Sequence, residues 1–322
     1  MAMQPSVGKA VSAGAAALGA FFGLWAASPA LASEPANEVI ISDGLLFPES
    51  LTSTPDGALL FGSTTTSTIL RAEPGAKEAS PWFDGKEAAL GRVLGVLADG
   101  QRDMLWVCSS AQDTAKPEES LTGLAAFRLS DQSLIGTFPF PDGKGLCNDI
   151  AVDEKGTVYA TDTREARVLR LADPAGPMEV WSADPLLEGV DGVAIASDGS
   201  IYVNSIVSGE LLRLDPAEDG KSADPVRLTL SRELGKPDGM RTAPDGSLIV
   251  AEQAGRVSRI EIAGDEARIT TIAEGFTQPP AVTIVGDRAY VLQSNLFFNR
   301  DPERKGTDPG PARAIAVPLK AS

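Results

Sequence analysis

Four oxygen-bearing side chains recur at one fixed distance from a downstream turn. Each of them lies eight residues before a glycine that ends a predicted turn. The side chains are Glu49, Asn148, Asp191 and Asp238, and the glycines are Gly57, Gly156, Gly199 and Gly246. If the fold brings equivalent positions of a repeat together, three carboxylates and one amide meet at a single place. The spacing therefore predicts a cluster of oxygen ligands.

Three converging carboxylates repel one another, so one must hold a proton or a cation must lie between them. Because every donor is an oxygen, the set favours a hard divalent cation, with calcium first, magnesium or manganese next, and zinc the poorest fit. The alternative is that Asn148, Asp191 and Asp238 only begin local turns. Glu49 is not a turn former and shares their position, which favours the metal site.

The composition excludes several kinds of chemistry. The 322 residues contain no histidine, which rules out a Ser-His-Asp or Cys-His nucleophile, a histidine-ligated metal and an imidazole general base. The formal net charge is −16, so phosphate backbones would be repelled and no nucleic-acid partner is expected. A small-molecule substrate remains the expected partner. The oligomeric state has no signal in the sequence.

The elements that must position the four side chains form an internal repeat. Turn signals of the Asp-Gly kind contain glycines that lie 40 to 56 residues apart. These are Gly57, Gly100, Gly156, Gly199, Gly246 and Gly286. A short strand-like run follows most turns, as at residues 200–203, and a further run then alternates apolar and polar residues, as at residues 210–214. Each unit of about 48 residues is therefore expected to hold four short strands.

Six such units predict an all-β fold, a six-bladed β-propeller. A single four-stranded sheet cannot bury both faces, whereas six sheets arranged radially can. Pairing of residues 38–41 with residues 313–317 would close the ring. A jelly roll does not predict this repeat, and the WD-type propeller signature needs histidine. The innermost strand of each blade borders the axis, so the four side chains are expected to point at one axial site.

Two units and two loops depart from the repeat. In the second unit the ligand position falls on Arg92, or on Leu94 if its hairpin is longer. The sixth unit has prolines at 279–280 and no ligand. Residues 111–122 and 299–311 are expected to be long loops, either lids or ordinary solvated connections.

Residues 1–32 have the pattern of a secretory signal peptide. Lys9 gives a positive start, residues 10–27 form an apolar run, and residues 30–32 offer a small-x-small cleavage site. The run is short and weakly apolar for a span of about 20 residues, so cleavage is favoured over an uncleaved anchor. Residues 33–322 are then one exported domain, periplasmic or secreted, with no membrane attachment after cleavage.

Two cysteines, Cys108 and Cys147, lie in or beside strand-like runs. In an oxidising compartment they could form a disulfide. The alternative is a pair of buried thiols, and the sequence leaves both open.

Four segments resemble the regucalcin/gluconolactonase family of six-bladed propellers, the senescence-marker-protein type. They are residues 47–50 (FPES), 147–153 (CNDIAVD), 190–193 (VDGV) and 236–240 (KPDGM). The resemblance implies an axial divalent ion, usually calcium, held by a Glu, an Asn and an Asp with another Asn close by. It also implies hydrolysis of lactones, and related propellers hydrolyse phosphotriesters.

Carried to this chain, the resemblance matches Glu49 and Asp238 to the outer ligands and Asn148 to the neighbouring Asn. The family's main Asn is replaced here by Asp191, which keeps an oxygen but adds a charge. The sugar-lactone members also carry an Arg where this chain has Leu146. A lactone or ester less polar than gluconolactone is therefore favoured.

The resulting hypothesis is a divalent-metal-dependent hydrolase that acts on a lactone or related ester through an activated water. Without histidine, a carboxylate must accept the proton, with Asp238 as the first choice and Asp191 as the second. The adjacent Ser50 and Asp149 are expected either to support the ligands or to be exposed. A non-enzymatic ligand-binding propeller with a structural calcium, or a phosphotriesterase-like hydrolase, are the alternatives.

Overall fold

The computed structural model describes residues 1–2, 36–111, 120–217 and 220–319. The expected signal peptide thus lies outside the described residues except for its first two, as do residues 112–119 of the first predicted loop. Within the described residues, no helix is both long enough and apolar enough to cross a bilayer.

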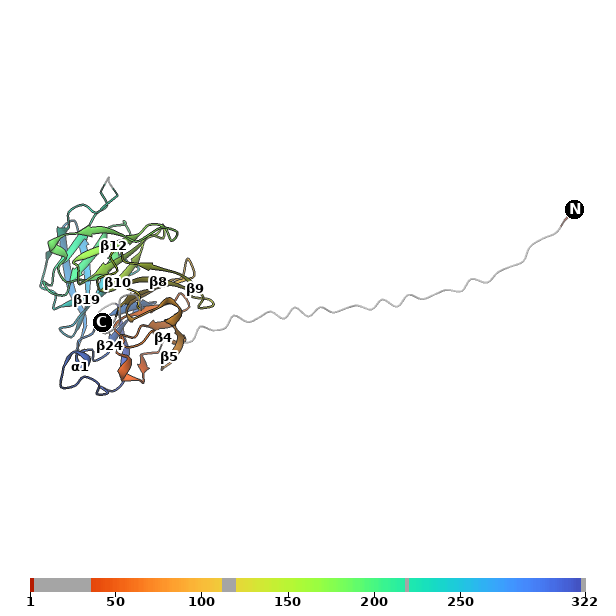
Figure 1. Cartoon of the computed structure of the whole chain (residues 1–322), viewed down its shortest axis with the longest axis horizontal. Helices are drawn as coiled ribbons and strands as arrows, with labels where there is room; N and C mark the ends of the chain where they lie inside the picture. Colours follow the sequence, from red (N-terminus) through yellow and green to blue (C-terminus); the bar gives the residue numbers. More distant parts are fainter. Residues whose placement is uncertain (3–35, 112–119, 218–219, 320–322) are drawn as a thin grey trace. The chain divides into compact units, whose positions relative to one another are not determined.

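Six sheets, each built on four antiparallel strands, form the blades of the molecule (Figure 1). Blade 1 contains β2 (Leu51–Ser53), β3 (Leu59–Phe61), β4 (Thr68–Ala72) and β5 (Ser80–Asp84). Blade 2 contains β6 (Arg92–Asp99), β7 (Met104–Ser110), β8 (Gly123–Arg128) and β9 (Leu134–Pro139). Blade 3 contains β10 (Cys147–Val152), β11 (Val158–Asp162), β12 (Arg167–Leu171) and β13 (Glu179–Ala183).

The second half of the chain repeats this plan. Blade 4 contains β14 (Val190–Ile195), β15 (Ile201–Ser205), β16 (Leu211–Leu214) and β17 (Val226–Arg227). Blade 5 contains β19 (Pro237–Thr242), β20 (Leu248–Glu252), β21 (Arg256–Ala263) and β22 (Glu266–Glu274), with β18 (Thr229–Leu230) parallel to its outer edge. Blade 6 contains β23 (Val282–Val285), β24 (Arg288–Gln293), β25 (Ala312–Pro318) and β1 (Glu38–Ile41).

The innermost strands form a closed ring. Contacts run from β2 to β6, β10, β14, β19 and β23, and from β23 back to β2. This circular order confirms the predicted all-β, six-bladed propeller. The ring places blade 1 opposite blade 4 across the central channel.

The two ends of the propeller meet in blade 6, as the sequence predicts. Strand β1 pairs antiparallel with β25, from Glu38 opposite Ile315 to Ile41 opposite Ala312. The first strand of the fold therefore forms the outer edge of the last blade, so that closing the ring uses residues from both ends of the chain.

Glycine sets the length of the innermost hairpins. Gly57, Gly156, Gly199 and Gly246 all have φ between 84 and 91°, a conformation that costs other residues strain. Blade 2 differs, because its hairpin runs from Asp99 to Met104 and places Asp103 at φ 55°. This longer hairpin changes which residue of blade 2 is equivalent to Asn148, Asp191 and Asp238 of the other blades.

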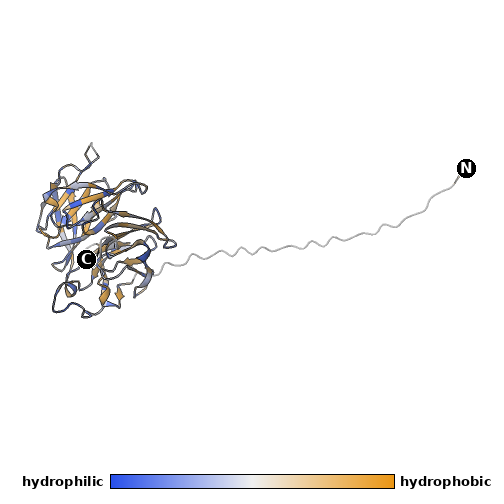
Figure 2. Cartoon of the chain, viewed as in Figure 1, coloured by the Kyte–Doolittle hydropathy of each residue, from blue (hydrophilic) through white to orange (hydrophobic). Residues whose placement is uncertain are grey.

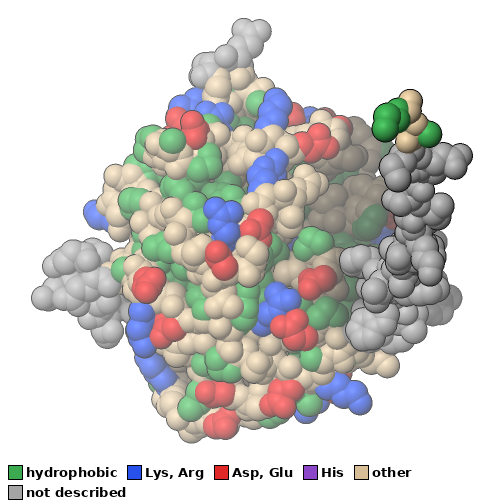
Figure 3. Space-filling view, turned by 90° about the vertical axis from the view of Figure 1, so that its right-hand side faces the viewer, with side chains coloured by type: hydrophobic (Ala, Val, Ile, Leu, Met, Phe, Trp, Pro, Cys, Tyr) green, Lys and Arg blue, Asp and Glu red, His purple; other side chains and the backbone are tan. Residues whose placement is uncertain are grey.

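The core lies between neighbouring blades. One cluster, for example, joins Leu51 and Phe61 of blade 1 to Tyr290 and Leu292 of blade 6. Strands such as β11 and β15 are buried along their whole length, because each blade packs against a neighbour on both of its faces. Apolar residues accordingly occur on strands throughout the fold (Figure 2). On the face shown in Figure 3, acidic side chains lie among basic ones rather than in one acidic patch.

Residues 294–311 connect β24 to β25 and contain the single-turn helix α1 (Phe297–Arg300). Arg304 stacks over Phe297 and Phe298, with its guanidinium carbon 5.8 and 5.1 Å from the ring centres. The predicted long loop at 299–311 is therefore an ordered connection with its own packing.

Candidate axial site

An irregularity in the innermost strands places the candidate ligands. The pairing register shifts between Cys147 and Ile150, between Val190 and Val193, and between Pro237 and Met240. Each shift lets two residues bulge out of the regular ladder, and the first of each pair is Asn148, Asp191 or Asp238. A bulge re-aims side chains, and here it occurs at the same position in blades 3, 4 and 5.

The pairing of the innermost strands also identifies the equivalent residue in the other three blades. Blade 2 shifts between Val93 and Val96, so its axial residue is Leu94, which settles the choice that the sequence left between Arg92 and Leu94. The residues two positions before the paired Leu51 and Val282 are Glu49 and Pro280. We call these six positions the axial ring, and it consists of Glu49, Leu94, Asn148, Asp191, Asp238 and Pro280.

The chain turns sharply just before the axial ring. The residue two positions earlier has positive φ in four blades: Phe47 at 43°, Gly189 at 70°, Lys236 at 54° and Gln278 at 44°. This conformation is strained for residues other than glycine. Blade 6 has this turn at Gln278 although its axial residue, Pro280, has no ligand side chain. The turn is therefore part of the blade fold and does not depend on a ligand at the axial position.

The four polar members of the axial ring are buried: Glu49 is 8% exposed, Asn148 5%, Asp191 4% and Asp238 3%. The amide of Asn148 donates to Asp191 Oδ2 at 3.0 Å. The structure thus brings together residues 43 positions apart in the sequence, as the repeat predicts.

The charge on Asp191 is uncompensated in this arrangement. Burial raises the pKa of Asp191 well above its usual range, and the nearby carboxylates of Asp238 and Glu49 raise it further. Its Oδ1 is buried and accepts no hydrogen bond from the described residues. A buried carboxylate oxygen in this state costs free energy unless it is protonated or bound by a cation.

The carboxylates do not already form a closed ligand set. Among the described residues, no group of three or more Asp, Glu or Cys side chains has the arrangement of a metal site. Leu94 and Pro280 flank Glu49 in the ring, whereas Asn148, Asp191 and Asp238 come from consecutive blades. The ring is therefore an arc of three polar residues with Glu49 facing it across the channel. Its oxygen donors and the unpartnered Asp191 Oδ1 fit a hard cation.

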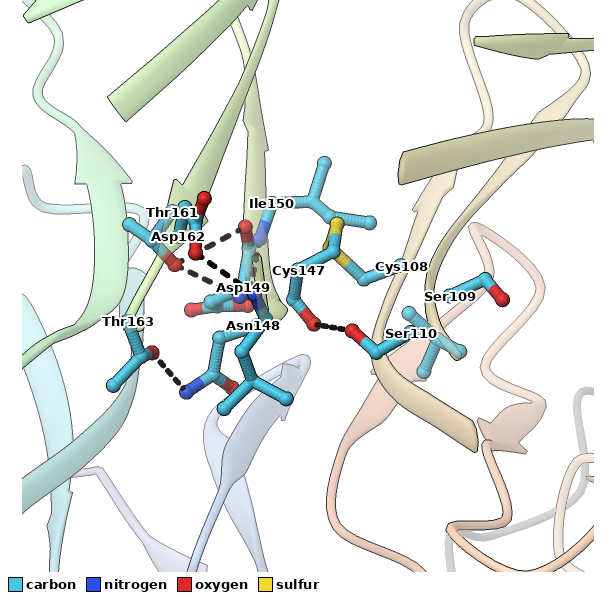
Figure 4. The surroundings of a disulfide bond; sticks show 12 residues. Cys108, Ser109, Ser110, Cys147, Asn148, Asp149, Ile150, Thr161, Asp162 and Thr163 are labelled. Carbon is cyan, nitrogen blue, oxygen red and sulfur yellow. Dashed lines mark hydrogen bonds between the residues drawn. A yellow bond between two sulfur atoms is a disulfide. The ribbon is translucent and has the colours of Figure 1, made fainter. Parts of the chain in front are cut away.

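Two residues that the sequence analysis missed orient the arc. Thr163 Oγ1 accepts a hydrogen bond from Asn148 Nδ2 at 2.9 Å (Figure 4). Gln253 Nε2 donates to Asp238 Oδ2 at 2.7 Å. Both lie fifteen residues after the side chain they contact, at the far end of the same hairpin. This shared offset is the signal in the sequence that identifies them.

Buried carboxylates also hold the segments that lead into the arc. Asp162 Oδ1 accepts from the Leu146 N–H at 2.8 Å, and Glu252 Oε2 accepts from the Gly235 N–H at 2.7 Å. Each carboxylate also pairs with an arginine at the start of the next strand, Arg167 in blade 3 and Arg256 in blade 5. These ion pairs anchor the backbone just before Asn148 and Asp238.

A disulfide fixes the start of β10. Cys147, which directly precedes Asn148, is bonded to Cys108 of β7 (Figure 4), and their Cα atoms are 5.2 Å apart. Both cysteines are fully buried. The bond joins blade 2 to blade 3 beside the arc, and it decides between the two states of the cysteines that the sequence left open.

Ser50 and Asp149 lie one residue beyond the ring and are each 4% exposed. Ser50 Oγ accepts from the Val96 N–H at 3.3 Å. Asp149 accepts from the backbone of Val193 and from Arg241. The exposed alternative for these two residues is therefore wrong, because both are bonded to neighbouring blades.

Comparison with known proteins identifies the fold. No protein-family model matches the chain, and no curated protein matches its sequence. A luciferin-regenerating enzyme aligns with a TM-score of 0.63 at 15% identity, over 88% of this chain and 97% of its own. A gluconolactonase from Xanthomonas campestris aligns with a TM-score of 0.59 at 14% identity, over 87% and 89%.

A third solved structure carries different chemistry on the same architecture. The PQQ-bound aldose sugar dehydrogenase from Streptomyces coelicolor aligns with a TM-score of 0.59 at 18% identity, over 89% of this chain and 99% of its own. At these identities the likeness shows the propeller fold alone. The similar structures include a gluconolactonase, from the family that the sequence resembles, but function has to be argued from the site.

Proposed function

We propose that this protein is an exported hydrolase that opens a lactone or a related ester at the axial ring with the help of one divalent cation. The observation that carries the proposal is the buried, oxygen-only set of Glu49, Asn148, Asp191 and Asp238, in which Asp191 Oδ1 has no hydrogen-bond partner. The fold likeness to a gluconolactonase supports the reaction class.

Calcium is the cation that this set suits best, with magnesium, manganese and zinc as alternatives. Glu49, Asn148, Asp191 and Asp238 would hold it. A bound divalent cation supplies charge that polarises the substrate carbonyl and lowers the pKa of a nearby water. In its presence Asp191 would remain ionised, because the cation offsets the burial and the repulsion that raise the pKa of this carboxyl.

The chain's own residues handle the proton. Asp238 accepts a proton from the attacking water, and Gln253 keeps the Asp238 carboxylate in place through its bond to Oδ2. The water oxygen bonds to the carbonyl carbon as the ester C–O bond breaks. The proton then passes from Asp238 to the departing alkoxide, which restores the carboxylate. Asp191 is the second candidate for this base, and Asn148 is held for the site by Thr163.

A substrate panel tests this proposal. The mature protein should hydrolyse members of a set of aliphatic lactones and aryl esters when calcium is present, and should lose that activity in EDTA. A tightly bound ion without turnover of any lactone, ester or phosphotriester would instead identify a ligand-binding propeller. Preferential release of a phosphodiester would identify a phosphotriesterase. Full activity after EDTA treatment would refute the metal-dependent mechanism.

A further inference from the structure

A second buried carboxylate lies one residue beyond the arc, on the innermost strand of blade 3. Asp149 follows Asn148 in β10, and its side chain is 6% exposed. Its Oδ1 accepts from the Ile150 N–H at 2.9 Å and its Oδ2 from the Val193 N–H at 3.1 Å. The equivalent residues of the other blades carry no charge, as Ser50, Gly95, Gly192, Gly239 and Ala281 occupy these positions. Asp149 is therefore the charged residue among these six equivalent positions.

Arg241 neutralises Asp149 across the channel. Its Nη1 donates to Asp149 Oδ1 at 2.9 Å and to Oδ2 at 2.8 Å. The two residues are 92 positions apart and come from blades 3 and 5. We call this contact the axial ion pair. Arginine stays protonated at any physiological pH, so it is a permanent positive charge at this point.

The groups around the guanidinium are the kind that bind a metal ion. Besides Asp149, Arg241 donates to the carbonyl oxygen of Met240 at 2.8 Å and to that of Val96 at 3.4 Å. Every acceptor is a carboxylate or a carbonyl oxygen, which are the ligands that hard cations prefer. These acceptors do not satisfy all the donors of the guanidinium, because its Nε is buried and makes no hydrogen bond with the described residues.

A cavity adjoins the axial ion pair. It has a volume of about 290 Å³, lies between the innermost strands of all six blades and has Arg241 in its lining. The rest of its lining is largely apolar, with the hydroxyl-bearing side chains of Thr52, Ser53, Thr242 and Thr283 among it. A small cation could therefore reach Asp149 through this cavity if Arg241 were removed.

We propose that Arg241 is a built-in cation that occupies a second metal-ion position, and that it limits the channel to the single ion of the axial ring. Removing the guanidinium would leave Asp149 buried and unneutralised, a state that a carboxylate escapes by binding a cation or a proton. The count of one ion in the wild type rests on the proposed function, whereas the gain of an ion on removing Arg241 does not.

Calcium stoichiometry tests the inference. Equilibrium dialysis followed by metal analysis should find one more calcium per chain in Arg241→Gln than in the wild type. The double variant Asp149→Asn/Arg241→Gln should show no such gain, because it lacks the charge that would bind the ion. An unchanged stoichiometry in folded Arg241→Gln, or an equal gain in the double variant, would overturn the inference.

A conservative variant keeps the test decisive if Arg241→Gln does not fold. Arg241→Lys retains a cation at the position and should bind the same number of calcium ions as the wild type. An additional ion in Arg241→Lys would contradict the inference. A wild type that binds no calcium, together with a gain of one in Arg241→Gln, would refute the axial ring as a metal site and still support the role of Arg241.

Discussion

Two buried carboxylates at the same end of the propeller have opposite surroundings. Glu252 is fully buried, yet its pKa is about 2. Burial by itself would raise that value, but hydrogen bonds from Arg232, the Gly235 N–H, Ser258 and Arg256 outweigh it. For Asp191, burial is reinforced by neighbouring carboxylates, and the pKa rises.

These opposite surroundings distinguish a structural carboxylate from a functional one in this fold. A carboxylate that the protein has already neutralised, such as Glu252, holds a loop in place. A carboxylate set among other carboxylates, such as Asp191, is stable only with a proton or an external cation. Substitutions in the two environments should therefore have opposite consequences.

The largest effect is expected from Asp238→Asn. This change removes the proposed proton acceptor while keeping the shape of the side chain, so kcat/KM should fall by about 10²–10⁴-fold. Steady-state kinetics with the best lactone would measure the loss, and circular dichroism should show an unchanged fold. The matched control is Asp198→Asn in an exposed turn, which should retain full activity. Comparable losses in both variants would contradict a specific role for Asp238.

Glu252→Gln should destabilise the fold. Without the carboxylate, Arg232 and Arg256 lose their shared counter-charge, and breaking a buried pair from one side costs about 3–5 kcal/mol. Urea unfolding would measure the change in the free energy of unfolding. Exposed Glu261 offers the control, because its contact to Arg268 at 4.0 Å is on the surface and Glu261→Gln should cost less than about 1 kcal/mol. A loss of less than about 1 kcal/mol for Glu252→Gln would contradict the structural role of this carboxylate.

Lowering the pH should remove the stabilisation that Glu252 gives the wild-type fold. A carboxylate with a depressed pKa stabilises the fold above its ordinary pKa and loses that contribution as the pH falls toward the folded value. For Glu252 the ordinary pKa is 4.5 and the folded one about 2, so about 3 kcal/mol should disappear between these limits. Urea titrations at several pH values should show this loss in the wild type and a flatter profile in Glu252→Gln. Parallel profiles would contradict the assignment.

Asp191→Asn is expected to have the smallest effect on the free energy of unfolding. It should stabilise the calcium-free fold, whereas Glu252→Gln should destabilise the fold. Replacing the carboxylate relieves repulsion within the arc, so the calcium-free protein should gain about 0.5–2 kcal/mol. The same change should weaken calcium binding, so added calcium would raise the melting temperature of the variant less than that of the wild type. Thermal unfolding with and without calcium measures both. Destabilisation of the calcium-free variant would mean that Asp191 is a structural carboxylate like Glu252.

Local patterns in the sequence predict much of the fold. Turn glycines such as Gly57 and Gly246 need a positive φ, and the short strands between them alternate in polarity, so a period and a number of blades can be read from neighbouring residues. The common spacing of Glu49, Asn148, Asp191 and Asp238 follows from the same period. Ring closure by residues 38–41 was also predictable, because a sixth blade otherwise lacks a strand.

The contacts between blades were decided only by the tertiary structure. The axial position of blade 2 is Leu94 because a longer hairpin shifts the register, and the pairing of Cys108 with Cys147 depends on how two blades meet. Arg241 reaches Asp149 across the channel from a strand two blades away. Such partners leave no mark in the local pattern, because their proximity depends on how the blades pack around the axis and not on spacing along the chain.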